Sequence, residues 1–268
     1  MAYPFSKGRS DRAVGRTVGG AGGSPDSIMP MPGLEKGVLD PPPSMGDAGP
    51  LWDRIDRIYC ISLRHRTDRQ ADAARAFFRV GLTDRVLFHL VDRHPDGCEA
   101  GIYAAHADCI RDALAAGARR VAVFEDDVVF ERFTPAGLAQ ALDFMETEPD
   151  WDLFCFGCMV RGSRPTGWPG VRRIDYQCLA HAYVLNRPFA ERLLARPYDG
   201  TAYDDRLRAL QRGRTFAACP CFAFQSDSAT DNDQTPVLNR VRALLGGIRR
   251  IQKANEFYHI HRRAVILA

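Results

Sequence analysis

Three consecutive acidic residues, Glu125, Asp126 and Asp127, lie between two apolar runs in "RRVAVFEDDVVF". Grouped carboxylates repel one another, and their burial is unfavourable unless a cation compensates the charge. In an extended chain residues i and i+2 share a face, so we expect Glu125 and Asp127 to point together, with Asp126 on the opposite side or turning into the loop. Two hard oxygen ligands on one side suit Mg²⁺ or Mn²⁺, which completes its coordination with substrate phosphates. The alternative is an exposed acidic turn after a strand.

A second group of charged residues follows an earlier apolar run, "RIYCISL" at residues 57–63. Arg64, Arg66 and Arg69 cluster directly after it, and arginine binds phosphate groups through paired hydrogen bonds. A divalent cation held by the acids would bridge to the diphosphate of a nucleotide and stabilise it as a leaving group. The alternative is the solvated, basic start of a helix.

The residues around these two motifs predict alternating strands and helices. The first five predicted elements, in chain order, are strand 57–63, helix 67–80, strand 85–91, helix 102–117 and strand 119–124. Thr67 and Gln70 match a capping box at the first helix, and Thr134 with Pro135 matches the start of a later one. Such alternation predicts an α/β fold with a mostly parallel central sheet. Ligands of these folds bind at the carboxyl ends of the strands, where the acids lie.

The whole chain has the length and composition of a protein with one large globular domain. It has 268 residues, of which 46% are hydrophobic and 26% charged, and a net charge of +3 that is too weak to indicate a nucleic-acid partner. Residues 1–50 are rich in Gly, Pro and Ser and predict a disordered tail, followed by a folded domain over 51–235. The basic stretch 236–268 predicts a helical extension. That extension either packs on the domain or lies on an anionic membrane surface.

The eight cysteines do not form a recognisable framework. Cys155 and Cys158 make a CxxC pattern inside the apolar run "WDLFCFGCMV", whereas zinc ribbons place two such pairs in loops. We therefore expect buried, reduced thiols, with a thioredoxin-type redox pair as the alternative. The N-terminal residues lack the apolar region of a secretory signal, and no apolar run is long enough to span a membrane. These features predict a soluble, cytoplasmic protein or one held at a membrane surface.

Five segments together resemble glycosyltransferase family 25 over roughly residues 55–230. In chain order they are "IYCISLRHRTDR", "HLVDRHPDG", "GIYAAHADCIRDALAAGARRVAVFEDDVVF", "AHAYVLNRPFAERLL" and "YDDRL". Each segment is weakly specific by itself, and their common order makes the resemblance fairly specific. The family is associated with bacterial lipopolysaccharide sugar transfer and with animal collagen galactosyltransferases. The resemblance does not extend to the N-terminal tail or the C-terminal stretch.

The resemblance implies a GT-A type fold, a UDP-sugar donor that is often UDP-galactose, and a divalent metal at the Glu-Asp-Asp motif. By position, Glu125 and Asp127 would hold Mn²⁺ or Mg²⁺. The residues expected near the donor are Leu63, Arg64, Arg69, His106 and Asp126. One departure stands out, because this chain has Ala105 before His106 where the family has serine. The alternative for the histidine is a hydrogen-bonded core residue.

Sugar transfer with inversion needs a base that takes the proton of the acceptor hydroxyl. The candidates are Asp204 and Asp205, which open a predicted helix in "TAYDDRLRAL". Their alternative role is a favourable interaction with the helix dipole. The polar loop "FQSDSATDND" supplies candidates for the acceptor side or the metal, namely Gln225 and Ser226, followed by Asp227 and Asp231. These loop residues also fit an ordinary turn.

The expected function is transfer of a hexose, most often galactose in this family, from a UDP-sugar to a hydroxyl group of a glycan. The acceptor would be lipopolysaccharide or another lipid-linked glycan, with peripheral contact to the inner membrane surface. A non-catalytic relative that binds a nucleotide sugar or glycan is the alternative. A nucleotidyltransferase is a third hypothesis, and it would need a glycine-rich phosphate loop after the first strand. The segment "LRHRTDR" contains no glycine there.

Overall fold

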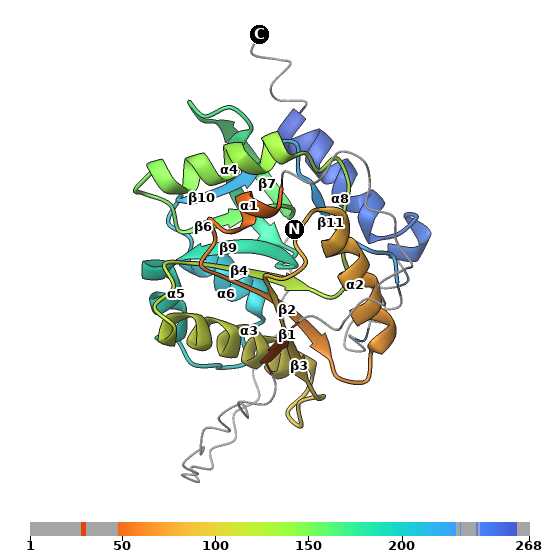
Figure 1. Cartoon of the computed structure of the whole chain (residues 1–268). Coiled ribbons are helices and arrows are strands. Elements are labelled where there is room, and N and C mark those ends of the chain that lie inside the picture. Colours follow the sequence, from red (N-terminus) through yellow and green to blue (C-terminus); the bar gives the residue numbers. More distant parts are fainter. Residues whose placement is uncertain (1–27, 31–47, 229–230, 232–239, 241, 262–268) are drawn as a thin grey trace, which may run out of the picture.

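A nine-stranded sheet forms the centre of the protein in the computed structural model, which describes residues 28–30, 48–228, 231, 240 and 242–261 (Figure 1). The strands are β1 (Ile28–Pro30), β2 (Arg57–Leu63), β3 (Val86–Val91), β4 (Arg120–Glu125), β5 (Val128–Phe130), β6 (Leu153–Cys155), β7 (Met159–Pro165), β8 (Val171–Cys178), β9 (Ala182–Asn186), β10 (Thr215–Ala218) and β11 (Ala223–Gln225). The helices are α1 (Gly49–Trp52), α2 (Thr67–Arg79), α3 (Cys98–Ala115), α4 (Pro135–Thr147), α5 (Arg187–Leu194), α6 (Tyr203–Leu210), α8 (Ile248–Glu256) and the π-helix η2 (Phe257–His261).

The strand order of the main sheet is β1-β3-β2-β4-β9-β6-β10-β8-β7. Strands β2, β3, β4, β6, β7 and β10 run in one direction, and β1, β8 and β9 run in the opposite direction. The expected α/β fold with a mostly parallel central sheet is confirmed. Because β2 and β4 are parallel neighbours, with Ile61 opposite Glu125, their carboxyl ends meet at one edge of the sheet.

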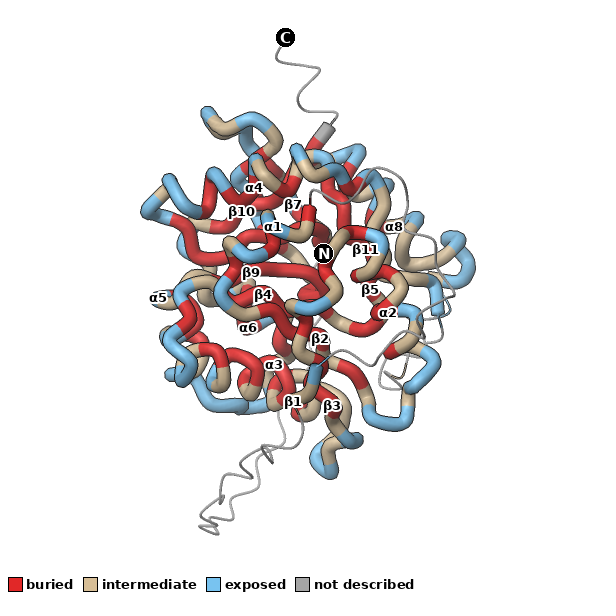
Figure 2. The backbone as a smooth tube through the Cα atoms, viewed as in Figure 1, coloured by how far each residue is buried: buried red, intermediate tan, exposed pale blue. Residues whose placement is uncertain are grey.

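Each face of the sheet carries its own hydrophobic core. Trp52, Phe77 and Phe124 belong to the cluster on the side of α1, α2 and α4. The opposite cluster joins α3, α5 and α6 to the sheet through residues such as Ile110 and Phe189. Figure 2 shows the central strands buried between these helices. Burial on both faces explains why β2 and β4 are almost continuous apolar runs, as parallel strands require.

The predicted elements named above agree closely with the observed ones, except at two helix starts. The strands expected at 57–63, 85–91 and 119–124 are β2, β3 and β4, and Thr134 caps α4 through the amide of Gly137. The capping box at Thr67 was wrong, because the N-cap of α2 is Arg66 and makes no side-chain cap bond.

One side-chain contact and one backbone conformation account for these differences at the helix starts. The Gln70 amide instead donates to the carbonyl oxygens of Leu63 and Arg64, at 2.9 and 3.2 Å, and so holds the end of β2. Helix α3 begins at Cys98, four residues before the expected start, after Gly97 in the left-handed region at φ 100°.

The CxxC segment forms a tight turn at the end of β6. All eight cysteines are free thiols in the structure, and Cys155 and Cys158 are buried. An added Cβ on Gly157 would lie 1.7 Å from the carbonyl oxygen of Ala223, so only glycine lets β11 approach so closely. The pattern therefore serves backbone packing, as expected for buried structural thiols.

The two ends of the chain are only partly described. Residues 28–30, inside the stretch predicted to be a disordered tail, form β1 at the edge of the sheet against β3. The rest of 1–47 lies outside the described residues, as do parts of 229–241 and residues 262–268. Helix α8 packs on the domain, where Gln252 and Glu256 are buried. The described helices include none that is both long and apolar enough to cross a bilayer.

Candidate functional site

A cavity of about 780 Å³ opens at the carboxyl ends of β2 and β4. Most of the residues predicted for the site line it, namely Leu63, Arg69, His106, Glu125, Asp126, Asp127, Asp204, Gln225 and Ser226. They come from β2, α2, α3, β4, the turn after β4, α6, β11 and the loop that follows it. Four predicted residues, Arg64, Arg66, Asp205 and Asp227, do not line the cavity.

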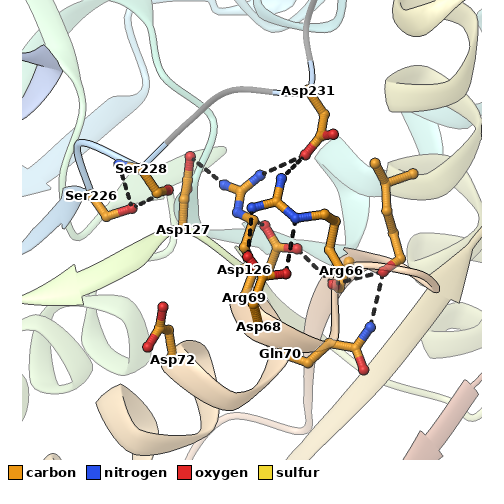
Figure 3. A network of polar contacts seen from close by, with 12 residues as sticks. Arg66, Asp68, Arg69, Gln70, Asp72, Asp126, Asp127, Ser226, Ser228 and Asp231 are labelled. Atoms are coloured by element: carbon orange, nitrogen blue, oxygen red, sulfur yellow. Dashed lines mark hydrogen bonds and ion pairs between the residues drawn. The ribbon is translucent and has the colours of Figure 1, made fainter.

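The three acids do not alternate in the way that an extended strand requires. Strand β4 ends at Glu125, and the chain turns at Asp126 and Asp127 before β5 begins. Both turn residues contact the guanidinium of Arg69, with Asp126 Oδ1 3.0 Å from Nε and Asp127 Oδ2 3.1 Å from Nη2 (Figure 3). Glu125 faces His106 instead. Alternation of faces ends with the strand, and Asp126 lies in the turn, which is one of the two positions expected for it.

Asp126 is held on all sides by β2 and α2. Its side chain is buried, its Oδ2 accepts a 2.6 Å hydrogen bond from the Ser62 hydroxyl, and its amide donates to the Ile61 carbonyl oxygen. Burial raises the pKa of Asp126, while Arg69 and Ser62 act in the opposite direction. This carboxylate is already satisfied by protein donors, so it orients Arg69 and the turn.

Asp127 is less completely satisfied. Its Oδ2 pairs with the guanidinium of Arg69 and accepts a 3.3 Å hydrogen bond from the Gln225 amide. Strand β11 places Gln225 opposite Val128 of β5. Its Oδ1 is buried and has no hydrogen-bond partner among the described residues. Burial, reinforced by repulsion from Glu125, raises the pKa of Asp127 to about 8. A buried carboxylate oxygen without a partner is unfavourable unless a ligand completes it.

Glu125 begins a chain of polar contacts that leads into the interior. Its Oε1 lies 3.5 Å from His106 Nε2, and His106 Nδ1 lies 2.8 Å from the hydroxyl of Tyr183. That hydroxyl is 2.6 Å from the hydroxyl of Tyr203, whose ring stacks on His106 at 4.0 Å. Burial lowers the pKa of His106 to about 3, so the imidazole is neutral. Burial and repulsion from Asp204 and Asp126 raise the pKa of Glu125 to about 8.

The structure distinguishes clearly between the two candidate bases. Asp204 lies at the first turn of α6 and accepts hydrogen bonds from the Tyr176 hydroxyl and from the amides of Leu179 and Ala180, both at 3.1 Å. Leu179 adopts φ 73°, a strained conformation that turns both amides toward this carboxylate. Burial raises the pKa of Asp204. Asp205 is exposed and pairs with Arg208 outside the cavity.

The remaining predicted residues are engaged with other protein groups. Arg64 is half-exposed and donates to the Leu90 carbonyl oxygen at 3.0 Å. Arg66 pairs with Asp68 and Asp231, so it neutralises carboxylates rather than presenting a free guanidinium. Asp227 pairs with Arg249 of α8. The arginines expected to bind phosphate directly are therefore engaged with acids in this structure.

The acidic turn offers few free oxygen atoms to the expected divalent cation. No group of three or more His, Cys, Asp or Glu side chains within the described part of the chain is arranged to hold a metal. The unpartnered Oδ1 of Asp127 and the 29% exposed side chain of Glu125 nevertheless supply hard oxygens to the cavity. Such a set fits a cation bound by one or two carboxylates plus ligand oxygens, and does not fit a cage made by protein alone.

Removing the guanidinium at the turn tests the electrostatics of the site. We expect Arg69→Met to lower the free energy of unfolding by about 3–5 kcal/mol at pH 8.5, because buried carboxylates lose their counter-charge. A folded-state pKa of about 8 for Asp127 means that stability falls as pH rises from about 4 to 8. Arg69 lowers that pKa, so its loss should matter much less at pH 5.5. Thermal and urea unfolding, with chelator present, would measure the loss of stability at both pH values.

Arg75→Met is the matched control for this change, because Arg75 lies on the same helix and forms an exposed ion pair with Asp72. It should change stability by about 0–1 kcal/mol. An Arg69→Met loss that is equal at both pH values would contradict the assigned role.

Sequence reasoning missed the hydroxyl groups that support the site. Ser62 holds Asp126, Tyr176 holds Asp204, and Tyr183 with Tyr203 holds His106. The available signal was the occurrence of hydroxyl-bearing residues inside otherwise apolar strands, together with the tyrosine that directly precedes Asp204. Buried tyrosine and serine hydroxyls usually satisfy a specific partner.

Comparisons with known proteins give relatives at low identity, and no family model matches the chain. A human protein named as an inactive glycosyltransferase 25 family member 3 is 27% identical over 171 residues, 53% of this chain and 29% of the relative. Its rat counterpart, also named as inactive, is 27% identical over 195 residues, 59% of this chain and 34% of the relative. The chain spans about a third of the length of these curated relatives.

Solved structures offer only distant likenesses. A glycosyltransferase involved in glycosylation of the major capsid of PBCV-1 has a TM-score of 0.40 and 10% identity, with 69% of this chain and 98% of that chain covered. A UDP-glucose pyrophosphorylase complexed with UDP-glucose has a TM-score of 0.37 and 15% identity, with 60% and 72% covered. At these TM-scores neither likeness bears on what this chain does. The curated relatives are glycosyltransferase 25 family members, and they confirm that the chain resembles this family over about half of its length.

Proposed function

We propose that the chain is a metal-dependent glycosyltransferase that moves a hexose from a UDP-sugar to a hydroxyl group of a glycan. The observation that carries this proposal is the Asp127 carboxylate, which has a buried, unpartnered oxygen beside Glu125 in a cavity of about 780 Å³. That volume is within the range typical of sites for small molecules and cofactors. The resemblance to glycosyltransferase family 25 supports the same reading.

The chain's own groups would divide the chemistry between two sides of the cavity. Glu125 and Asp127 would hold Mn²⁺ or Mg²⁺, and a bound cation would supply charge stabilisation for the departing diphosphate. Asp204 would accept the proton of the acceptor hydroxyl. Its Oδ2 accepts a hydrogen bond from the Leu179 amide and has a lone pair left for a substrate. Because burial raises its pKa, Asp204 is a stronger base than an exposed aspartate.

The finer parts of the proposal rest on the family resemblance alone. Galactose is the proposed sugar, and a lipopolysaccharide-type or other lipid-linked glycan is the proposed acceptor. The proposed location is the cytoplasm, with peripheral contact to the inner membrane surface. A screen of UDP-sugars follows directly once donor binding is established.

A non-catalytic relative that binds a nucleotide sugar is the second candidate. The contacts of Arg69 with Asp126 and Asp127 favour it, because the acids are partly neutralised without any metal. Ala105 in place of the family's serine is a further departure, and the curated relatives are named as inactive. The two candidate functions predict different turnover but the same binding of the donor.

Calorimetric titration of the full chain with UDP, with Mn²⁺ and with chelator, is the test. We expect binding that requires Mn²⁺ and that UMP, which lacks the second phosphate, reproduces only weakly. Slow hydrolysis or transfer of a UDP-sugar in the same preparation supports the enzyme. Binding without any turnover supports the second candidate, and absence of UDP binding in both conditions contradicts both.

A further inference from the structure

A second cavity, of about 740 Å³, lies at the β7 edge of the main sheet. Its charged lining consists of Arg161 and Arg164 from β7, Arg173 and Asp175 from β8, and Arg208 from α6. Four arginines therefore face one aspartate. We call this cavity the edge groove. The β7–β8 hairpin that forms it projects from the body of the protein, and its tip is exposed (Figures 1 and 2).

The arginines of the edge groove are unlike those of the main cavity, because most of them have no acidic partner. Across the described residues Arg161, Arg164 and Arg173 form no ion pair. Arg164 lies directly opposite Arg173 in the antiparallel β7–β8 pair. Like charges directly opposite each other on neighbouring strands are destabilising. An anion bound between them would remove this repulsion.

Charged side chains on an edge strand can also serve only to prevent pairing with another sheet. Two observations favour a ligand over that explanation. The groove is concave and includes residues from outside the edge strand, because Gln211 and Arg208 come from the end of α6. Arg208 is also held in place, since its guanidinium pairs with Asp205 and donates to the Gln177 carbonyl oxygen at 2.9 Å. A strand edge protected by charge alone needs neither feature.

Helix α6 connects the edge groove to the main cavity. Asp204, at the start of α6, lines the main cavity, and Arg208 lines the edge groove. Arg208 follows Asp204 by four positions, which is about 6 Å along the helix axis. Strand β8 makes the same connection, because Asp175 lines the groove and Leu179 lines the main cavity. The two cavities therefore border the same helix and the same strand.

We propose that the edge groove is an anion-binding subsite that holds phosphate or carboxylate groups of the glycan acceptor while its reacting hydroxyl lies beside Asp204. The inference rests on the proposed function, since it assigns the acceptor of that same site to the acidic glycans. Arginine recognises both anions through paired, charge-assisted hydrogen bonds. Neutral glycans would lack these contacts.

Calorimetric titration with two tetrasaccharides tests the subsite, one anionic and derived from heparin, the other the neutral maltotetraose. We expect the wild-type chain to bind only the anionic one. Combining Arg164→Glu with Arg173→Glu should weaken that binding roughly tenfold or more. Combining Arg79→Glu with Arg196→Glu makes the same change of charge at exposed arginines outside both cavities, and should leave it unchanged. If the glutamate pair fails to fold, Arg164→Gln with Arg173→Gln replaces it.

UDP binding in the presence of Mn²⁺ is measured on each variant, so that the two proposals can fail separately. Unchanged UDP binding with loss of tetrasaccharide binding supports the subsite. Equal tetrasaccharide binding by the wild-type chain and the groove variant overturns the subsite and leaves the proposed function standing. Tetrasaccharide binding without any UDP binding overturns the acceptor assignment together with the proposed function. Groove-dependent binding to phosphatidylglycerol vesicles, without tetrasaccharide binding, overturns the glycan assignment in favour of a membrane surface.

Discussion

Asp127→Asn is expected to abolish Mn²⁺-dependent UDP binding and to lower sugar transfer by more than about 100-fold, because an amide is a poor ligand for a hard cation. The change is nearly isosteric, and the new amide oxygen can still accept from Gln225. The folded state already favours a neutral group at this position, since the pKa of Asp127 is raised to about 8. Stability with chelator present should therefore be retained or should rise above pH 8.

This combination of lost binding and retained stability separates a ligand role from a structural one. Calorimetry and thermal unfolding of the same preparation measure both quantities. Asp72→Asn is the matched control, because Asp72 lies on α2 close to Arg69 but pairs with Arg75 at the surface (Figure 3). It should change neither quantity appreciably. Metal-dependent UDP binding that survives in Asp127→Asn would contradict the proposed site.

Asp204→Asn is expected to lower the turnover rate of sugar transfer by about 10²–10⁴-fold with little change in UDP binding, because it removes the general base and leaves the acidic turn intact. The acid limb of the pH–rate profile should also disappear. For the wild-type chain that limb should lie above the range of an exposed aspartate, since burial raises the pKa of Asp204. Steady-state kinetics across pH would measure both effects.

The amide of the new asparagine would face one of the backbone donors of Leu179 and Ala180, so some loss of stability is expected, of about 1–3 kcal/mol. The pH profile and the unchanged UDP affinity distinguish a lost base from a disturbed fold. Asp205→Asn, at the neighbouring exposed residue, serves as the control and should retain turnover. The opposite result, with turnover lost at Asp205 and kept at Asp204, would reject the assignment of the base.

The arrangement of the main strands could be predicted from the sequence because it depends on local patterns. Strands β2 and β4 are short, nearly continuous apolar runs, and such runs form buried parallel strands wherever helices cover both faces. The acids follow β4 directly, so their place at the carboxyl edge of the sheet followed from chain order alone. His106 and Asp204 were also identified, through the family resemblance and the position of Asp204 at a helix start.

Three features of the site could not be predicted, because each depends on contacts between different structural elements. The turn after β4 places Asp126 and Asp127 against the guanidinium of Arg69, which comes from α2. The capping box at Thr67 failed because Gln70 found carbonyl partners at the end of β2.

Asp204 could be preferred to Asp205 as the base only once the structure showed that the Leu179 amide, in a strained conformation, donates to Asp204. No local pattern at α6 indicates this contact. The pairing of Arg164 with Arg173 in the edge groove likewise depends on the register of β7 and β8. Thus the sequence by itself determined which strands form and where the acids emerge from the sheet. Only the tertiary structure decided which charges meet, because ion pairs and strand register are set by packing between distant segments.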